Sequence, residues 1–374
     1  MNHLWFLMFL FFLGVEVLAQ NESRNPIPTA IPFLRITPDA IAAGVGEQGI
    51  ATPADVFSQQ WNPAKYIYSE YSSGIGISYT PYLSKLVDDI FLGNATFFGR
   101  INDRSIWAGS LRYFSLGEIE KTALIGGGIV QQGVERPNEL SIDITYALEL
   151  GTQFSLAVTG RYIRSDLRLN LYGYPRGAQT VGADVSGFHQ GKWIQQRLIR
   201  TMWRYGFRVS NLGPKLNYEG RNSRSYFIPT NLGVGGGLDL GFDTENVLGI
   251  YVELNKLLVP TPSEWTSEGY VQPEIGFLEG LFTSFTDAPG GLREEINEVT
   301  ISFGISYQFM EKFIIRGGYF GESKIKGPRR YLTLGTGIKS KSLGLDLSYL
   351  FSTSSIATPL DNTLRISASW HWNQ

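Results

Sequence analysis

Hydrophobic residues alternate with small or polar ones along residues 299–309. The hydrophobic positions are Val299, Ile301, Phe303, Ile305, Tyr307 and Phe309. The positions between them are Thr300, Ser302, Gly304, Ser306 and Gln308. Successive side chains of a β-strand point to opposite faces, so this stretch predicts a strand with one hydrophobic face and one polar face.

The same alternation recurs along residues 140–148, 248–254, 343–351 and 364–372. These runs approach the about 9–11 residues that a tilted strand needs to cross a bilayer. Their charged members all fall on the polar face: Asp143, Glu253, Asp346 and Arg365. A charge on the lipid face at mid-membrane costs about 2–4 kcal/mol, so this placement favours a barrel with a polar lumen. A soluble sandwich could show the same alternation with its hydrophobic face turned inward.

The lengths of the connections distinguish these two folds. The alternation predicts about fourteen strands after residue 73, a number compatible with an outer-membrane barrel. They begin near Gly74, Asp89, Arg104, Glu139, Phe154, Thr180, Trp203, Pro229, Asn246, Asn297, Lys312, Arg330, Ser342 and Thr363. Short turns alternate with long loops at residues 115–138, 167–179, 212–228 and 256–296, and residues 190–201 are ambiguous. Short turns on one side and long extracellular loops on the other are typical of outer-membrane barrels. We therefore predict an all-β, antiparallel transmembrane barrel over residues 74–374.

Residues 20–73 do not alternate. They contain six prolines and many hydrophobic residues, among them Phe33, Ile36 and Trp61. A barrel of eight strands is already filled by its own side chains, so a wider one needs additional material inside it. We predict that residues 20–73 form an N-terminal plug in the lumen.

The first 19 residues have the features of a secretory signal peptide. An apolar run covers residues 4–17, and Val17-Leu18-Ala19 is a small-x-small cleavage motif. The alternative, an N-terminal anchor helix, is disfavoured because the run is short and contains Glu16. An exported chain of alternating strands predicts location in a bacterial outer membrane.

Composition and motifs give little support for catalysis, a cofactor, a metal or nucleic-acid binding. The net charge is −2 and there is no cysteine, which excludes thiol chemistry and a disulfide framework. Residues 44–49 match the Gly-x-Gly-x-x-Gly spacing, but proline-rich chain precedes them instead of a strand, so we expect glycines in tight turns. Asp88-Asp89 and Glu294-Glu295 could bind calcium, although solvated loop charge is the favoured interpretation.

The loop of residues 256–296 is unusually hydrophobic. It contains Trp265, Tyr270, Phe277, Leu278, Leu281, Phe282 and Phe285. A fully solvated loop would not carry so many hydrophobic side chains. They either fold back over the barrel mouth as a lid or form a docking surface for a partner protein or an exported cargo.

Several motifs carry a resemblance to known proteins. The motif of Trp61, Asn62, Pro63 and Ala64, after Gly44-x-Gly46, looks like the plug of FadL-type barrels. Further stretches are similar to the PorV family of the type IX secretion system: Phe33-Leu34-Arg35-Ile36, Ser78-Tyr79-Thr80-Pro81, residues 86–90, 111–119 and 161–167, Phe227-Ile228-Pro229-Thr230-Asn231-Leu232 and residues 254–262.

The resemblance implies a FadL-like barrel that is not itself the protein-conducting pore. Members of this family bind cargo that carries a conserved C-terminal domain. They collect it at the SprA translocon and pass it to an attachment complex that contains the sortase PorU. The resemblance implies no catalytic residues.

Two other functions stay open at this stage. A FadL-like transporter of lipids or other hydrophobic compounds is suggested by the apolar, proline-rich plug. An outer-membrane enzyme with its site in the loops is disfavoured, because no exposed segment contains a convincing catalytic set.

Overall fold

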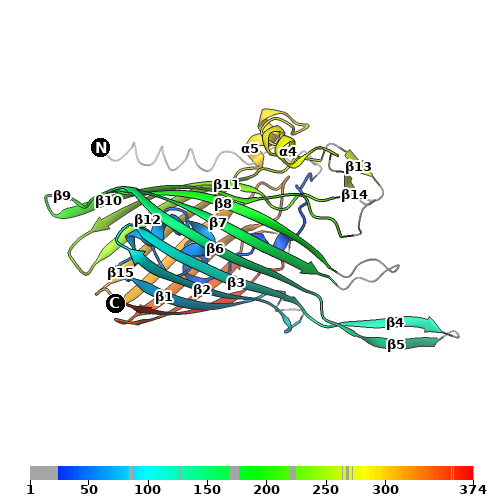
Figure 1. Ribbon diagram of the computed structural model, residues 1–374, viewed down its shortest axis with the longest axis horizontal. Helices are drawn as coiled ribbons and strands as arrows, with labels where there is room; N and C mark the ends of the chain where they lie inside the picture. The colour runs from blue at the N-terminus through cyan, green and yellow to red at the C-terminus, as the bar shows by residue number, and fades with distance from the viewer. Residues whose placement is uncertain are drawn as a thin grey trace, which may run out of the picture.

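The computed structural model describes residues 24–83, 87–125, 128–167, 177–218, 225–262, 264–266, 269–271, 273–354, 356 and 358–373. Within these residues, 14 strands form one closed antiparallel barrel (Figure 1). The strands are β1 (Ser73–Pro81), β2 (Ile90–Asn102), β3 (Ser105–Leu116), β6 (Asn138–Gly151), β7 (Phe154–Asp166), β8 (Ala178–Gln190), β10 (Ile199–Leu212), β11 (Asn231–Gly241), β12 (Val247–Leu257), β15 (Thr300–Phe309), β16 (Phe313–Gly321), β17 (Arg330–Lys339), β18 (Leu343–Ser352) and β19 (Leu364–Trp372).

Each strand pairs with its neighbours in the wall, and pairing of β1 with β19 closes the barrel. Every strand begins within a few residues of its predicted start, so the predicted fold class is confirmed. We assign the end with long loops to the cell exterior and the end with short turns to the periplasm.

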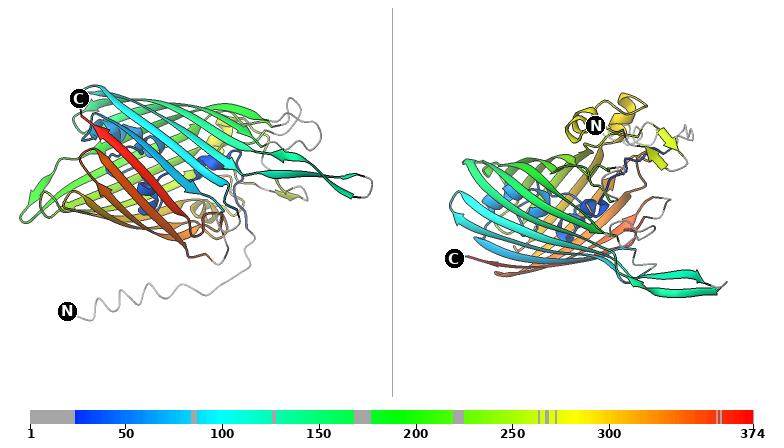
Figure 2. Two further views of the ribbon diagram at one scale, coloured as in Figure 1. Left: turned by 90° about the horizontal axis from the view of Figure 1, so that it is seen from below. Right: turned by 45° about the vertical axis from the view of Figure 1, so that its right-hand side comes forward.

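The long loops contain secondary structure that the strand pattern did not predict. The first forms a hairpin of β4 (Ile119–Ile125) and β5 (Gly128–Glu135) that projects beyond the barrel wall (Figures 1 and 2). The largest contains β13 (Glu264–Thr266), β14 (Gly269–Val271), α4 (Phe277–Thr283) and α5 (Leu292–Asn297). At the periplasmic end, β9 (Ile194–Gln196) extends the wall by pairing with β10. Among the described residues, none of the helices has the length and apolar character needed to cross a membrane.

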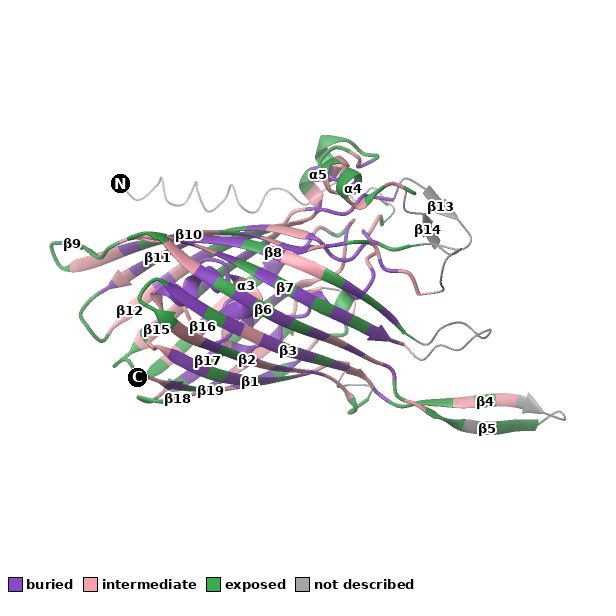
Figure 3. Cartoon of the chain, viewed as in Figure 1, coloured by how far each residue is buried: buried purple, intermediate pink, exposed green. Residues whose placement is uncertain are grey.

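Exposed and buried residues alternate along the wall strands (Figure 3). Hydrophobic side chains such as Ile301, Phe303 and Ile305 point outward and are exposed to the surroundings. The four charged residues predicted for the polar face, Asp143, Glu253, Asp346 and Arg365, are all buried inside. The register therefore puts a hydrophobic surface toward lipid and a polar surface toward the lumen, as predicted.

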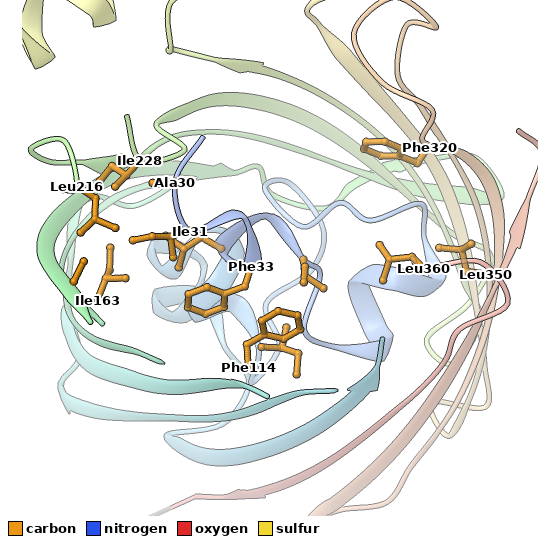
Figure 4. Packing of buried hydrophobic residues seen from close by; sticks show 14 of the residues in the cluster. Ala30, Ile31, Phe33, Phe114, Ile163, Leu216, Ile228, Phe320, Leu350 and Leu360 are labelled. Atoms are coloured by element: carbon orange, nitrogen blue, oxygen red, sulfur yellow. The ribbon is translucent and has the colours of Figure 1, made fainter. Parts of the chain in front are cut away.

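Residues 24–72 fill the lumen. They form the short helices η1 (Pro32–Arg35), α2 (Ala40–Gly44), α3 (Ser58–Trp61) and η2 (Pro63–Tyr68), joined by irregular chain. The segment starts at the extracellular mouth, where the Asn25 backbone N–H donates to the Ile325 carbonyl oxygen (2.8 Å), and ends at the periplasmic start of β1. Figure 4 shows Ile31 and Phe33 of this segment inside the ring of strands, packed against wall residues such as Phe114.

The polar face of the wall is held together by buried ion pairs. The Arg161 guanidinium lies between two carboxylates, 2.7 Å from Asp143 and 3.1 Å from Asp184. Arg208 lies 2.5 Å from Asp184, and Arg112 lies 3.9 Å from Asp143. A buried charge that loses its partner costs several kcal/mol, so these pairs depend on one another.

The first prediction concerns the lipid face. Ile305 lies in the middle of β15 with 46% of its surface exposed. We expect Ile305→Arg to destabilise the barrel by about 2–4 kcal/mol, because it places a charge in hydrocarbon. Urea unfolding of the protein in lipid vesicles would measure this.

Ile305→Val is the matched control, because it keeps an apolar side chain at the same depth. Equal stability of Ile305→Arg and Ile305→Val in vesicles would contradict the assignment of this face to lipid.

Candidate functional site

The plug is bound to the wall through its own backbone. One Glu253 carboxylate oxygen accepts from the backbone N–H of Gly49 (2.9 Å) and of Ile50 (2.8 Å). The Ser367 hydroxyl accepts from the Ala40 N–H (2.8 Å). Inward side chains of β12 and β19 thus satisfy backbone groups that the plug, with little regular structure, cannot satisfy itself.

The Trp61-Asn62-Pro63-Ala64 motif forms the largest local group of these bonds. The Asn62 amide donates to the Ile50 carbonyl (3.1 Å) inside the plug and to the Gly187 carbonyl (3.0 Å) of β8. Its side-chain oxygen accepts from the Ala64 N–H (3.2 Å), which caps η2. Pro63 occupies the first turn of η2, where a missing N–H is tolerated. The motif therefore joins two parts of the plug to the wall.

Two carboxylates in the plug are also fully engaged. Glu47 accepts from Arg365 (2.6 Å) and from the Tyr331 hydroxyl, which ties the plug to β19 and β17. Asp39 caps α2 by accepting from the Ala42 N–H (2.8 Å) and also accepts from the Trp61 indole (2.9 Å). Burial, with a smaller contribution from the charge of Asp55, raises the pKa of Asp39 to about 6.

Glycines allow the plug backbone to lie directly against the wall. Gly46 has a φ of +85°, and a Cβ there would lie 2.7 Å from the Tyr319 carbonyl oxygen. On β11, a Cβ at Gly237 would lie 2.7 Å from the Ala51 carbonyl oxygen. The prediction of turn glycines in the plug is thus confirmed at Gly46, and Gly237 allows the same close approach on the wall.

Cavities remain at both ends of the plug. A cavity of about 600 Å³ opens toward the periplasm, with the ion pairs Arg204–Asp239 (2.6 Å) and Arg316–Asp346 (2.7 Å) in its wall. A smaller cavity of about 130 Å³ lies toward the exterior, beside Trp61.

The described part of the loop of residues 256–296, which we call the lid, is clamped at the rim of the extracellular mouth. Lys256 lies 2.9 Å from Glu295 and 2.5 Å from Glu298, while Lys326 lies 2.5 Å from Glu294 and 2.9 Å from Glu298. We call these five residues the lid clamp. They attach α5 and the residue after it to the end of β12 and to the β16–β17 loop.

The start of the plug joins the same assembly. The Asn25 amide donates to Glu294 (2.9 Å) and to the Pro262 carbonyl (3.2 Å). On the inner side of α4, Gly280 is buried so close to Phe227 and Pro260 that an added Cβ would lie 2.5 Å from the Phe227 ring. The lid therefore has a fixed inner face.

The outer face of the lid is hydrophobic and exposed. Leu278 and Phe282 are four residues apart on α4, and Leu292 and Ile296 are four residues apart on α5. Phe282 is 71% exposed and Leu292 is 78% exposed. Residues four apart share one side of a helix, and the two helices lie beside each other at the extracellular end, above β11 in the view of Figure 1 (see also Figure 2). We call these four residues, with the exposed Phe285, the lid patch.

The structure divides the hydrophobic loop residues found in the sequence into three groups. Phe282 and Phe285 belong to the lid patch, whereas Phe277 and Leu281 are half-buried beside it. Trp265 and Tyr270 occupy opposite positions of the β13–β14 hairpin, and their side chains lie outside the described part of the structure. The lid and docking interpretations thus apply to opposite faces of one segment.

Two surface features were missed in the sequence. Leu292 and Ile296 are absent from the predicted hydrophobic residues of this loop, because they flank the acidic pair Glu294-Glu295. Their spacing of four residues is the signal that identifies them. The β4–β5 hairpin, which lies in the predicted long loop of residues 115–138, exposes Ile129, Val130 and Val134.

Across the described ranges, no group of three or more histidine, aspartate or glutamate side chains is placed to hold a metal ion. His371 of β19 points into the lumen and stacks on Tyr71 of the plug with ring centroids 4.5 Å apart.

Comparison with known proteins adds a family and a fold. The sequence model of the family "Type IX secretion system protein PorV" matches residues 19–264. No curated protein matches the chain.

Solved structures match most of the chain at low identity. The crystal structure of the P. putida toluene transporter TodX has a TM-score of 0.53 at 10% identity, covering 90% of this chain and 99% of that chain. The TodX monoaromatic hydrocarbon channel deltaS2 mutant has a TM-score of 0.51 at 10% identity, with 90% and 98% covered. A Pseudomonas aeruginosa FadL homologue has a TM-score of 0.44 at 10% identity, with 94% and 100% covered. At these identities, the TodX barrels support the fold alone.

The second prediction tests the plug. Asn62→Ala removes the bonds to the Ile50 and Gly187 carbonyls, and we expect it to weaken plug docking by about 1–3 kcal/mol. The variant should then conduct ions more often than the wild type in planar bilayers. Gln60→Ala is the control, because the Gln60 side-chain oxygen has no partner. Equal conductance of all three proteins would contradict the role of Asn62.

The third prediction concerns pH and the lid. Burial, aided by the charges of Glu295 and Glu298, raises the pKa of Asp287 to about 6, although a bond from the Thr261 N–H opposes the rise. A carboxyl with a raised folded-state pKa stabilises the fold below its unfolded value, and this contribution is lost as pH rises through about 6. The lid should therefore exchange its amide hydrogens more slowly at about pH 5 than at about pH 7.5, after correction for intrinsic rates.

Asp287→Asn should remove this pH difference, because the amide does not titrate. A difference that persists in Asp287→Asn would show that another group is responsible.

Proposed function

Because the chain belongs to the PorV family of the type IX secretion system, we propose that it holds secreted cargo at the outer-membrane translocon of that system and passes it to the surface attachment complex. The partners are an SprA-type translocon, a PorU-type sortase complex, and secreted proteins with the C-terminal domain that the system recognises. The proposed role is one of binding and transfer, without catalysis.

The observation that carries this proposal is the lid patch. A hydrophobic group of this kind on a surface that faces water is typical of a protein-binding site. Large apolar and aromatic side chains such as Phe282 contribute most of the binding energy when a partner covers them. The lid clamp holds the patch in place before a partner arrives, so little ordering entropy is lost on binding.

The plugged lumen supports a binding role over a conducting one. The plug is fixed by bonds that run from β12, β17 and β19 to its backbone and carboxylates. A folded or extended polypeptide would have to replace all of these bonds in order to pass. Cargo is therefore handled at the outer end of the barrel and not inside it.

The β4–β5 hairpin is a second contact of the same proposal. It projects from the mouth with hydrophobic residues on its surface, of which Ile129 is the most exposed (77%). Its strands pair only with each other, so each has a free edge to which an extended segment of a partner can add.

Transport of a lipid or another hydrophobic compound is the alternative function. The observation that favours it is the periplasmic cavity of about 600 Å³, whose wall includes the apolar side chains of Val56, Phe98 and Met202. This volume is within the range of small-molecule sites. Loss of uptake with normal secretion in a deletion strain would favour transport over the secretion role.

The fourth prediction tests the lid patch. The double variant Phe282→Asp/Leu292→Asp places two charges at the most exposed positions of the patch, where a bound partner would bury them. We expect at least a tenfold loss of co-purification with translocon or cargo from detergent-solubilised membranes, because burying an unpaired charge is strongly unfavourable. The barrel should stay folded, as judged by its heat-modifiable mobility on gels.

Glu279→Gln is the control, since it changes an exposed polar residue of α4 and leaves the patch intact. Normal co-purification and secretion in the double variant would refute the assignment of the patch.

A further inference from the structure

The ambiguous stretch of residues 190–201 forms a β-hairpin at the periplasmic end. Ile194 is paired with Thr201 and Gln196 with Ile199. The turn has Arg197 at a φ of +52°, and the Gln195 amide donates to the Arg197 carbonyl oxygen (3.0 Å). The hairpin projects past its neighbours at the end of the barrel opposite β4 and β5 (Figure 1, left).

The hairpin is cationic and contains no acidic residue. Its basic residues are Lys192, Arg197 and Arg200. Arg200 faces the lumen side, where its guanidinium lies 4.4 Å from the ring centroid of Trp193 and donates to the Thr244 carbonyl oxygen (3.4 Å). Lys192 and Arg197 are exposed.

The outward face of the hairpin continues the lipid-facing surface of β10. On that strand Trp203 and Tyr205 point outward and stack with ring centroids 6.3 Å apart. Side chains two residues apart share a face, and directly paired residues share it too, so Thr201, Ile199 and Ile194 extend this face toward the periplasm. Leu198 at the tip is 88% exposed.

The neighbouring turn lies at the same level. Gly241 pairs with Arg200, so Phe242 is level with Ile199, and Phe242 is itself exposed at the end of β11. Exposed aromatic residues at strand ends mark the boundary between hydrocarbon and headgroups. The tip of the hairpin therefore extends from this boundary into the headgroup layer.

We infer that the hairpin of residues 191–200 is a cationic lip that binds the phosphate groups of anionic phospholipids in the periplasmic leaflet. Its apolar outward face enters the membrane interface while Lys192 and Arg197 reach the phosphates, as in amphipathic segments at bilayer surfaces. A protein partner is a poorer fit, because a stable protein interface needs roughly 800 Å² on each side and this hairpin adds only a three-residue strand.

Single-cysteine labelling can test the lip directly, because the natural chain contains no cysteine. An environment-sensitive fluorophore is attached at Leu198→Cys in the full barrel, reconstituted into nanodiscs that contain brominated phosphatidylglycerol in phosphatidylcholine. Tyr205→Cys on the lipid face is the positive control, and Ile129→Cys at the opposite end is the negative control.

We expect quenching at position 198 to approach that at position 205. Quenching at position 198 should fall several-fold when Lys192→Gln and Arg197→Gln are introduced into the labelled protein. It should also fall in high salt and when phosphatidylcholine, not phosphatidylglycerol, carries the bromine. The matched double variant Lys312→Gln/Lys341→Gln, which removes the same charge from other periplasmic turns, should leave it unchanged.

Three results would overturn the proposal. One is emission at position 198 that matches position 129 in every lipid mixture. Another is an equal loss of quenching in both double variants, which would assign the effect to rim charge in general. The third is quenching that does not depend on lipid charge, together with a periplasmic protein that co-purifies only when Lys192 and Arg197 are present. That result would make the hairpin a protein contact.

Discussion

The structure depends on one constraint, which is that the backbone of the plug must be hydrogen-bonded inside a closed barrel. The backbone groups of the wall strands are already used in pairing with their neighbours, so only inward side chains are left to serve the plug. Glu253, Ser367 and Thr333 do this by accepting from backbone N–H groups of the plug. Each such group would cost about 1–3 kcal/mol if it were left buried without a partner. The polar lumen of the barrel is therefore the binding site for its own N-terminal segment.

This constraint directs function to the ends of the barrel. The lumen is filled by the plug and by ion pairs such as Arg161–Asp184, with cavities left at both ends. The surfaces that remain free differ in chemistry. The lid patch at the extracellular end is hydrophobic and carried on helices, whereas the periplasmic hairpin is cationic and continuous with the lipid face. Under the two proposals made above, one end of the barrel docks a partner and the other anchors in lipid.

The wall strands could be predicted from the sequence because a charged side chain on the lipid face of a barrel costs free energy. Moving Asp143 or Arg365 by one position would place a charge in lipid. The register can therefore be predicted from the alternation of hydrophobic and polar residues. The loops obey no such rule. The helices α4 and α5 lie in a stretch predicted as loop, because they are held by contacts such as Lys256 with Glu298 that join distant parts of the chain. The β4–β5 hairpin also lies in a predicted loop, although its strands pair with each other. The lid patch combines Phe282 of α4, which the sequence analysis singles out, with Leu292 of α5, a helix that lies beside α4 in the folded chain.

The way in which the lid is anchored bears on how docking can work. Its inner face is tied to the plug through Asn25 and to the wall through Lys256 and Lys326, all by bonds to carboxylates of α5 or the residue that follows it. Lifting the lid would break buried ion pairs and leave charges without partners, which is costly. The lid patch points the other way and shares none of these side chains. A partner can therefore bind the lid patch without breaking these ion pairs or moving the plug.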